Sequence, residues 1–137
     1  MPAPFSERLI LGAGIATAIV EHGRAGYPDE VCGIVGGRGG RGWLLYLGRN
    51  VAPRPRSSYE LDVDTLSRQI ELEAAGLELV AIYHSHPRGP EAPSNTDIGR
   101  AFYPDAVYII CSLADRDKAV LRGYRILDGR TWEIELA

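Results

Sequence analysis

Two of the three histidines in this chain, His84 and His86, stand two residues apart directly after an apolar segment. In a β-strand, residues i and i+2 point to the same face, with their Cα atoms about 6.5–7 Å apart. Imidazole rings placed in this way can reach one metal ion at the zinc–nitrogen distance of about 2.0–2.1 Å. Binding sites also tend to lie at strand ends in α/β sheets. The spacing therefore predicts a metal site at the end of this strand.

A third ligand has to come from outside the strand, and the next carboxylates along the chain belong to Glu91 and Asp97. Asp97 is expected in the first turn of a helix, so a rigid element can return its side chain toward the strand. Glu91 lies in a segment rich in proline and glycine and is the weaker candidate. Two histidines and one aspartate leave the fourth tetrahedral position of zinc to water, which is the open arrangement of a catalytic site.

The same residues also have a structural interpretation that needs no metal. Ser94 and Asp97 match the capping box of a helix N-terminus, and a histidine near a strand end is commonly a surface or hydrogen-bonded residue. The metal site is favoured because the histidine pair, a proline-rich loop and Asp97 fall within fourteen consecutive residues. The cap can itself help to aim the Asp97 carboxylate. His22 matches no motif and is expected on a helix surface.

Apolar periodicity and turn residues predict the elements that position this site. Strands are expected at 8–11, 31–35, 43–47, 77–83, 106–113, 119–126 and 131–136, helices at 14–23, 62–75 and 95–103, and loops at 50–58 and 87–93. This order predicts one mixed α/β domain over residues 1–137.

Two of these elements carry specific expectations about burial and conformation. The helix at 62–75 is expected to start at Asp62 and to bury one apolar face, formed by Val63, Leu66, Ile70 and Ala74. Six of the ten residues from 33 to 42 are glycine, which predicts a turn rather than a strand interior.

The composition excludes several classes of protein. Hydrophobic residues make up 45% and charged residues 24% of the 137 positions, which is typical of a globular protein. Fifteen basic and eighteen acidic residues give a formal charge of −3, whereas a nucleic-acid binder needs a concentrated positive surface. The apolar run at 9–20 faintly imitates a secretory signal but is too short to span a bilayer. We expect no nucleic-acid and no membrane partner.

The two cysteines, Cys32 and Cys111, lie far apart in separate apolar runs. Thiols in this setting are expected to be small buried hydrophobic groups rather than a disulfide. No CxxC pair is present, so the zinc-ribbon and thioredoxin-type sites are excluded. Free thiols are typical of a reducing compartment, and we expect a cytoplasmic protein.

The pattern His84-x-His86, seven intervening residues and Ser94-x-x-Asp97 resembles the complete signature of the JAMM (JAB1/MPN/Mov34) metallopeptidase family. That family also carries an upstream glutamate in a proline-led strand motif, and the stretch PDEVCGIVGG at 28–37 is similar to it. The element order matches over essentially the whole chain. The resemblance implies a JAB1/MPN-like fold with a central mixed β-sheet flanked by helices, similar to the cytidine-deaminase-like architecture.

The resemblance also implies roles for five residues. His84, His86 and Asp97 would ligate one catalytic Zn²⁺. Glu30 would be the general base that takes a proton from the attacking water and passes it to the leaving amine. Ser94 would hold the water or stabilise the tetrahedral oxyanion. Without the family, Glu30 would be an ordinary charged residue at a strand start.

The short chain is similar to the minimal, stand-alone prokaryotic members of the family, which act on the C-terminal tails of small ubiquitin-fold proteins and of ThiS/MoaD-type sulfur carriers. The resemblance implies a zinc metallopeptidase or isopeptidase that cleaves after the C-terminal glycine of a Gly-Gly tail. An isopeptide, a linear peptide and a carrier–amino-acid amide all remain open as the scissile bond, and so does the oligomeric state.

Two alternatives come from related proteins. A non-catalytic MPN-type scaffold would bind partners only, but such members usually lose ligands that this chain retains. RadC-type proteins share a closely similar His-x-His-Pro…Ser-x-x-Asp signature, although they are longer and carry an N-terminal helical region. Zinc deaminases are excluded because position 86 is His and no CxxC follows it.

Overall fold

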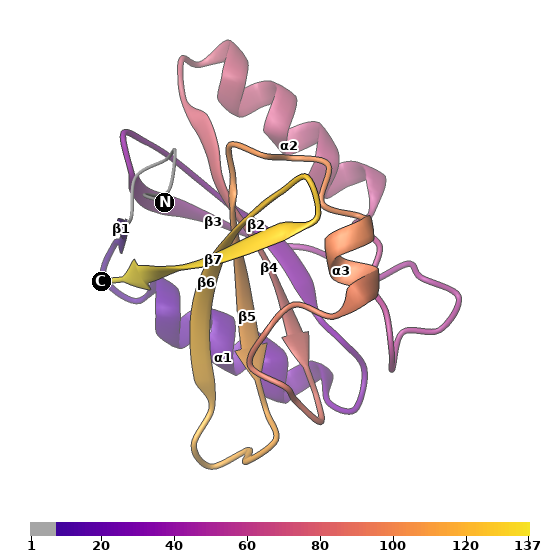
Figure 1. The fold of residues 1–137 in the computed structure, drawn as a ribbon. Helices are drawn as coiled ribbons and strands as arrows, with labels where there is room; N and C mark the ends of the chain where they lie inside the picture. The colour runs from indigo at the N-terminus through magenta and orange to yellow at the C-terminus, as the bar shows by residue number, and fades with distance from the viewer. Residues whose placement is uncertain (1–7) are drawn as a thin grey trace.

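The computed structural model describes residues 8–137, which fold into a β-sheet and three helices (Figure 1). The strands are β1 (Arg8–Leu11), β2 (Cys32–Arg38), β3 (Arg41–Leu47), β4 (Glu78–His86), β5 (Val107–Ser112), β6 (Val120–Leu127) and β7 (Arg130–Leu136). The helices are α1 (Ile15–Gly26), α2 (Val63–Ala74) and α3 (Asn95–Gly99). Within residues 8–137, no helix has the length and apolar character needed to cross a membrane.

The sheet is mixed and closes on itself. Its strands pair in the order β1-β3-β2-β4-β5-β6-β7, and the short strand β1 also pairs with β7. The β1–β3, β1–β7 and β4–β5 pairs are parallel, and the other pairs are antiparallel. The predicted mixed α/β architecture is confirmed. Closure through β1 goes beyond the prediction, because the choice of pairing partners depends on contacts between distant segments.

Strand β4 is covered on both faces, which explains its nearly continuous apolar sequence. Ala81 and Tyr83 belong to the hydrophobic cluster that includes Ile19 of helix α1. Ile82, which points to the opposite face, belongs to a second cluster that includes Leu72 of helix α2. The even-numbered residues at the end of β4 therefore lie on the α2 side of the sheet.

Helix α2 buries a different face from the predicted one. Val63 and Ile70 are 77% and 70% exposed, whereas Thr65 and Leu72 are buried. The N-cap explains the rotation, because the Asp62 carboxylate accepts hydrogen bonds from both the backbone N and the Oγ1 of Thr65 at 3.2 and 2.7 Å. This buried cap fixes Thr65 against the sheet, and Leu72 follows on the same face two turns later.

The glycine-rich stretch is also different from the prediction, because most of it forms strands β2 and β3. Only Gly39 and Gly40, with φ of +61° and +77°, form the turn between them. Gly33 lies inside β2, where an added Cβ would come within 2.4 Å of the Tyr83 hydroxyl oxygen. The glycine is thus required by the close approach of a neighbouring side chain and not by a turn.

Helices α1 and α3 differ in length from the predicted segments. Helix α1 continues through Gly23 to Gly26, because Gly23 packs against the side chain of Leu113 and does not end the helix. Helix α3 is only five residues long and ends at Gly99. Beyond it, Tyr103 packs against the hydrophobic cluster beneath α2 and is not helical.

Three further expectations concern single side chains. Cys32 and Cys111 are buried free thiols, as predicted, and burial raises the pKa of Cys32 to about 12. The surface position expected for His22 is wrong, because the ring is half-buried and its Nδ1 atom lies 2.7 Å from the hydroxyl oxygen of Tyr83. That hydroxyl needs a hydrogen-bond partner because Tyr83 is fully buried.

Candidate metal centre

His84 and His86 occupy the last positions of β4 and point to the same face, as the spacing of two residues requires. Both side chains are buried, and their Nε2 atoms are 3.0 Å apart. The ring of His84 stacks against that of Tyr59, with centroids 4.3 Å apart and an angle of 23° between the planes. Tyr59 lies in the loop before α2, and no motif in the sequence indicates that it covers a histidine.

Asp97 completes this group from helix α3. Its Oδ2 atom lies 3.2 Å from Nε2 of His84 and 3.0 Å from Nε2 of His86. The capping box of α3 orients the carboxylate, because Ser94 N donates to Asp97 Oδ2 at 2.9 Å and Asp97 N donates to Ser94 Oγ at 3.1 Å. The helix cap and the histidine pair therefore meet at the same carboxylate oxygen.

The separations between these three atoms fit a metal ion. Ligand atoms at about 2.0–2.1 Å from a tetrahedral zinc centre are about 3.3 Å apart. The observed separations of 3.0, 3.0 and 3.2 Å are close to this value. Two imidazole nitrogens and one carboxylate oxygen also form a donor set that zinc accepts, and three ligands leave one position open.

The ring of His86 is held in the orientation that a metal ligand needs. Its Nδ1 atom donates to the carbonyl oxygen of Pro90 at 2.8 Å, which leaves the lone pair of Nε2 directed toward His84 and Asp97. Within residues 8–137, the buried Nδ1 atom of His84 has no such partner.

Glu30 lies beside His86 because of the register between β2 and β4. Cys32 pairs with His84 in this antiparallel ladder, and the backbone N of Ser85 donates to the carbonyl oxygen of Val31 at 3.0 Å. Glu30 comes two residues before the start of this ladder, and it lines the same cavity as His86. Sequence reasoning without the family motif gives no signal for this pairing.

The Glu30 side chain is buried and has an unused acceptor. Only 6% of the residue is exposed, and Oε1 has no hydrogen-bond partner within residues 8–137. Burial raises the pKa of Glu30 to about 7, although the nearby His86 opposes the shift. A buried carboxylate without a donor is costly unless a bound water or substrate supplies one. The group is therefore suited to accepting a proton near neutral pH.

The side chains of the centre favour an ionised aspartate. Burial alone would raise the pKa of Asp97, but hydrogen bonds from His84 and His86 outweigh it and hold the pKa well below its usual range. The pKa of His84 is lowered by burial. For His86, hydrogen bonds to Asp97 and to the Pro90 carbonyl outweigh burial and raise the pKa.

Glu91, the other carboxylate considered as a third ligand, forms an ion pair away from the histidines. Its Oε1 atom accepts a hydrogen bond from Nε of Arg122 at 2.6 Å. It does not belong to the group of possible metal ligands that the described residues form around Asp97. The structure therefore places the helix-borne carboxylate, and not the loop-borne one, against the histidines.

A cavity of about 420 Å³ opens beside the histidines and contains Glu30. Its lining includes Ser94 and His86, so two of the residues implied as catalytic share one space with a metal-ligand candidate. The remaining lining comes from the loop after β4 and from the segments around the β2 start and the 50–58 loop: Pro28, Arg56, Ser57, Pro87, Arg88, Gly89 and Pro90.

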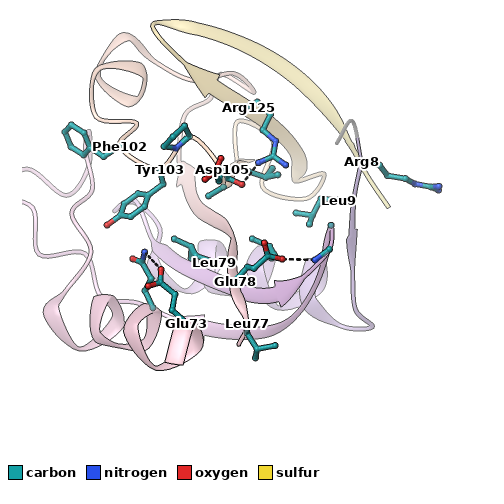
Figure 2. A pocket seen from close by; sticks show the side chains of 17 residues that line it. Arg8, Leu9, Glu73, Leu77, Glu78, Leu79, Phe102, Tyr103, Asp105 and Arg125 are labelled. Atoms are coloured by element: carbon teal, nitrogen blue, oxygen red, sulfur yellow. Dashed lines mark hydrogen bonds between the residues drawn. The ribbon is translucent and has the colours of Figure 1, made fainter. Parts of the chain in front are cut away.

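A second cavity, of about 410 Å³, lies at the opposite end of β4 (Figure 2). Here Glu78 accepts a hydrogen bond from the backbone N of Gly39 at 2.8 Å, and Arg125 donates to the carbonyl oxygen of Asp105. These charged groups bind separate backbone atoms and do not converge on a common point, as Figure 2 shows. No histidine or cysteine lines this cavity.

The chain that forms this sheet and this histidine–aspartate group matches a known protein family in sequence. The family described as prokaryotic homologues of the JAB domain matches residues 12–127. The chain belongs to this family.

Among characterised relatives, the chain is 41% identical over 114 residues to the desampylase of Haloferax volcanii, with 78% of this chain and 82% of the relative covered. It is 36% identical over 127 residues to the CysO-cysteine peptidase of Mycobacterium tuberculosis, with 91% and 87% covered. A solved structure of a Desulfitobacterium hafniense protein superposes with a TM-score of 0.81 at 29% identity, covering 94% of this chain and 91% of the other. A JAB1/MPN domain protein from Archaeoglobus fulgidus shares the fold, with a TM-score of 0.60 at 18% identity and 96% and 100% covered.

Proposed function

We propose that this chain is a zinc-dependent peptidase that hydrolyses the amide bond after the C-terminal glycine of a ubiquitin-like or sulfur-carrier protein. The observation that carries the proposal is the convergence of His84, His86 and Asp97 at 3.0–3.2 Å beside the buried carboxylate of Glu30. The names of the relatives support it, since one is a desampylase and another a CysO-cysteine peptidase. A third relative, a probable TtuB-protein conjugate cleaving protease from Thermus thermophilus, is 43% identical over 75 residues and covers 54% of this chain and 50% of its own length.

In this function, His84, His86 and Asp97 hold the metal. A bound zinc ion supplies a Lewis acid and lowers the pKa of its water to about 7. Glu30 accepts the proton of the attacking water and delivers it to the nitrogen of the leaving amine. The raised pKa of Glu30, about 7 in the metal-free protein, suits a group that must both take and release a proton.

Ser94 has a second task besides capping α3. Its oxygen accepts the backbone hydrogen bond of Asp97, while its hydroxyl hydrogen has no acceptor within residues 8–137. Because Ser94 lines the same cavity as Glu30, this hydrogen is available to the water or to the oxyanion of the tetrahedral intermediate. The proposal includes a Gly-Gly tail on the partner, because glycine has no side chain to obstruct a close approach to the centre.

The test is hydrolysis of a fusion in which a ThiS/MoaD-type or ubiquitin-like protein ending in Gly-Gly is extended at its C-terminus. The zinc-loaded protein is expected to release the extension, as followed by mass spectrometry. Glu30→Gln should lower kcat by about 100-fold or more, which is the usual contribution of a general base, while zinc content stays at one ion per chain.

A matched control is Glu91→Gln, which makes the same chemical change in a carboxylate that is paired with Arg122 outside the metal group. This variant should retain activity. Full activity in Glu30→Gln would remove the residue from the base role. Absence of stoichiometric zinc in protein purified without chelator, together with no cleavage, would instead favour the non-catalytic scaffold.

A further inference from the structure

The cavity beside the metal centre is lined by two arginines that catalysis does not use. Arg56, from the loop before α2, and Arg88, from the loop after β4, line it together with Glu30. Glu30 is the one acidic residue in the described lining. The described lining thus holds two arginines and one glutamate, although the whole chain has a formal charge of −3.

Neither arginine is committed to a strong partner. Within residues 8–137, no hydrogen bond or ion pair holds the guanidinium of Arg88, which is exposed. Among the described residues, Arg56 makes a single ion pair, with Asp29 at 4.0 Å, and both side chains of this pair are half or more exposed. A long, exposed pair of this kind is weak and can be exchanged for another carboxylate. Both arginines are thus available to a ligand.

The position of the general base identifies which part of the substrate enters this cavity. Under the proposed function, Glu30 hands a proton to the leaving nitrogen, so the nitrogen has to come within about 2.6–3.2 Å of its carboxylate. The leaving group must then occupy the cavity that Glu30 lines. In an α-amino acid, the carboxylate carbon is two covalent bonds from the nitrogen and falls into the same space. In a lysine ε-amine, four methylene groups follow the nitrogen and no carboxylate lies within reach.

We propose that Arg56 and Arg88 bind the free α-carboxylate of the leaving group, so that the preferred substrate is a carrier protein extended by a single amino acid. This inference rests on the proposed function and selects one of its possible scissile bonds. Hydrolysis breaks the C–N bond between the carrier glycine and the amino acid. The water oxygen adds to the glycyl carbon, a proton reaches the nitrogen through Glu30, and the products are the carrier carboxylate and a free amino acid. Guanidinium groups suit this recognition because they bind carboxylates in a bidentate geometry.

The experiment compares two substrates that differ only at the terminal group. Both are a ubiquitin-fold carrier ending in Gly-Gly and extended by one alanine, which carries either a free α-carboxylate or an α-carboxamide. The zinc-loaded protein is expected to prefer the carboxylate by about tenfold or more in kcat/KM, mainly through KM, because a hydrogen bond to a charged group is lost in the amide.

Arg56→Gln and Arg88→Gln should each reduce this preference, and the double variant should bring the ratio near one, because the loss in kcat/KM falls mainly on the carboxylate substrate. Arg88→Lys should restore part of it, because the charge returns without the bidentate geometry. Arg38→Gln is the matched control, since Arg38 is exposed at the opposite end of β2, and it should keep the wild-type ratio. Isothermal titration of the zinc-loaded protein with free alanine measures binding without turnover. The affinity for alanine should be lower in Arg56→Gln and in Arg88→Gln than in the wild type.

The outcomes separate the two levels of the proposal. Equal cleavage of both substrates by the wild-type protein, or an equal loss on both in the arginine variants, overturns carboxylate recognition and leaves the peptidase function standing. Cleavage of neither substrate by the zinc-loaded protein overturns the proposed function itself.

Discussion

The two ends of strand β4 carry cavities of almost equal volume, about 420 Å³ and about 410 Å³, but different chemistry. At the C-terminal end, three ligand atoms from β4 and α3 lie within 3.2 Å of one another and are shielded from solvent. At the N-terminal end, Glu78 and Arg125 each bind a backbone atom of a different loop (Figure 2). The size of a cavity therefore says little about chemistry here. What distinguishes the C-terminal end is that buried side-chain atoms of the kind that bind metals converge on one point.

The strongest test of this contrast makes the same carboxyl-to-amide change at both ends. Asp97→Asn changes a proposed zinc ligand. Loss of an outer partner of a ligand lowers metal affinity roughly 10- to 100-fold, and the loss here should be larger. Glu78→Gln keeps a side-chain oxygen for Gly39 and should leave zinc content unchanged. Metal analysis by mass spectrometry after gel filtration measures both. Equal zinc content in the two variants would contradict the ligand assignment.

The second test concerns the cost of burying Glu30 in the metal-free protein. Its pKa is raised from 4.5 to about 7, so between these values the unfolded chain gives up its proton first and the free energy of unfolding falls as pH rises. This rise of the pKa corresponds to at most about 3 kcal/mol of folding stability, all of which is lost above pH 7.

Glu30→Gln cannot ionise, so in the presence of chelator it should be more stable than the wild type at pH 8 and equally stable below pH 4.5. Urea denaturation at several pH values gives the difference. Glu78→Gln, at the other end of β4, should show no such pH-dependent gain. A constant difference across the range for Glu30→Gln would show that its carboxyl group does not titrate as described.

The third test compares two glycines of the β2–β3 hairpin. Gly33→Ala brings a Cβ within 2.4 Å of the Tyr83 hydroxyl and 2.5 Å of the Tyr46 carbonyl oxygen, and should destabilise the fold by about 2–3 kcal/mol. Because Tyr83 precedes His84, zinc affinity should fall as well. Gly39→Ala meets no atom within 4 Å but has a φ of +61°, so it should cost only about 1 kcal/mol. Thermal denaturation and zinc titration of both variants would show whether the clash or the backbone strain dominates.

The smallest effects are expected when the N-terminal caps of helices α3 and α2 are removed. Ser94→Ala removes the cap that orients Asp97 and should weaken zinc binding more clearly than it lowers stability, because α3 is only five residues long. Asp62→Ala removes the cap of α2, together with its bond to Thr65 Oγ1, and should cost about 1–2 kcal/mol with zinc affinity unchanged. Chemical denaturation and zinc titration give the two readouts. The reverse pattern would mean that the Ser94 cap serves stability alone.

The local pattern predicts most of the metal centre. The spacing of His84 and His86 in an apolar strand and the capping signature of Ser94 and Asp97 are both read within fourteen residues. The choice between Asp97 and Glu91 is not local, because it depends on Arg122, thirty-one residues after Glu91, engaging the Glu91 carboxylate. The stacking of Tyr59 on His84 is likewise a contact between segments distant in the sequence.

The errors in the predicted elements have the same origin. Periodicity alone places Val63 and Ile70 on the inner face of α2, but the buried Asp62 cap and the packing of Leu72 turn that face outward. Glycine content alone predicts a turn around Gly33, but the side chain of Tyr83 from a neighbouring strand occupies the space that a Cβ would need. In both cases a contact with a neighbouring element, that of Leu72 with the sheet or that of Tyr83 with Gly33, outweighs a preference within one segment.

By itself, the sequence determines the alternation of strands and helices, the metal-binding pattern and its likeness to a family, because period, capping and ligand spacing are properties of short segments. The tertiary structure decides that β1 closes the sheet, that the pairing of β2 with β4 brings Glu30 to the same cavity as His86, and that Arg56 and Arg88 line this cavity too. These arrangements join residues far apart in the chain, and only the packing of a complete sheet fixes their distances.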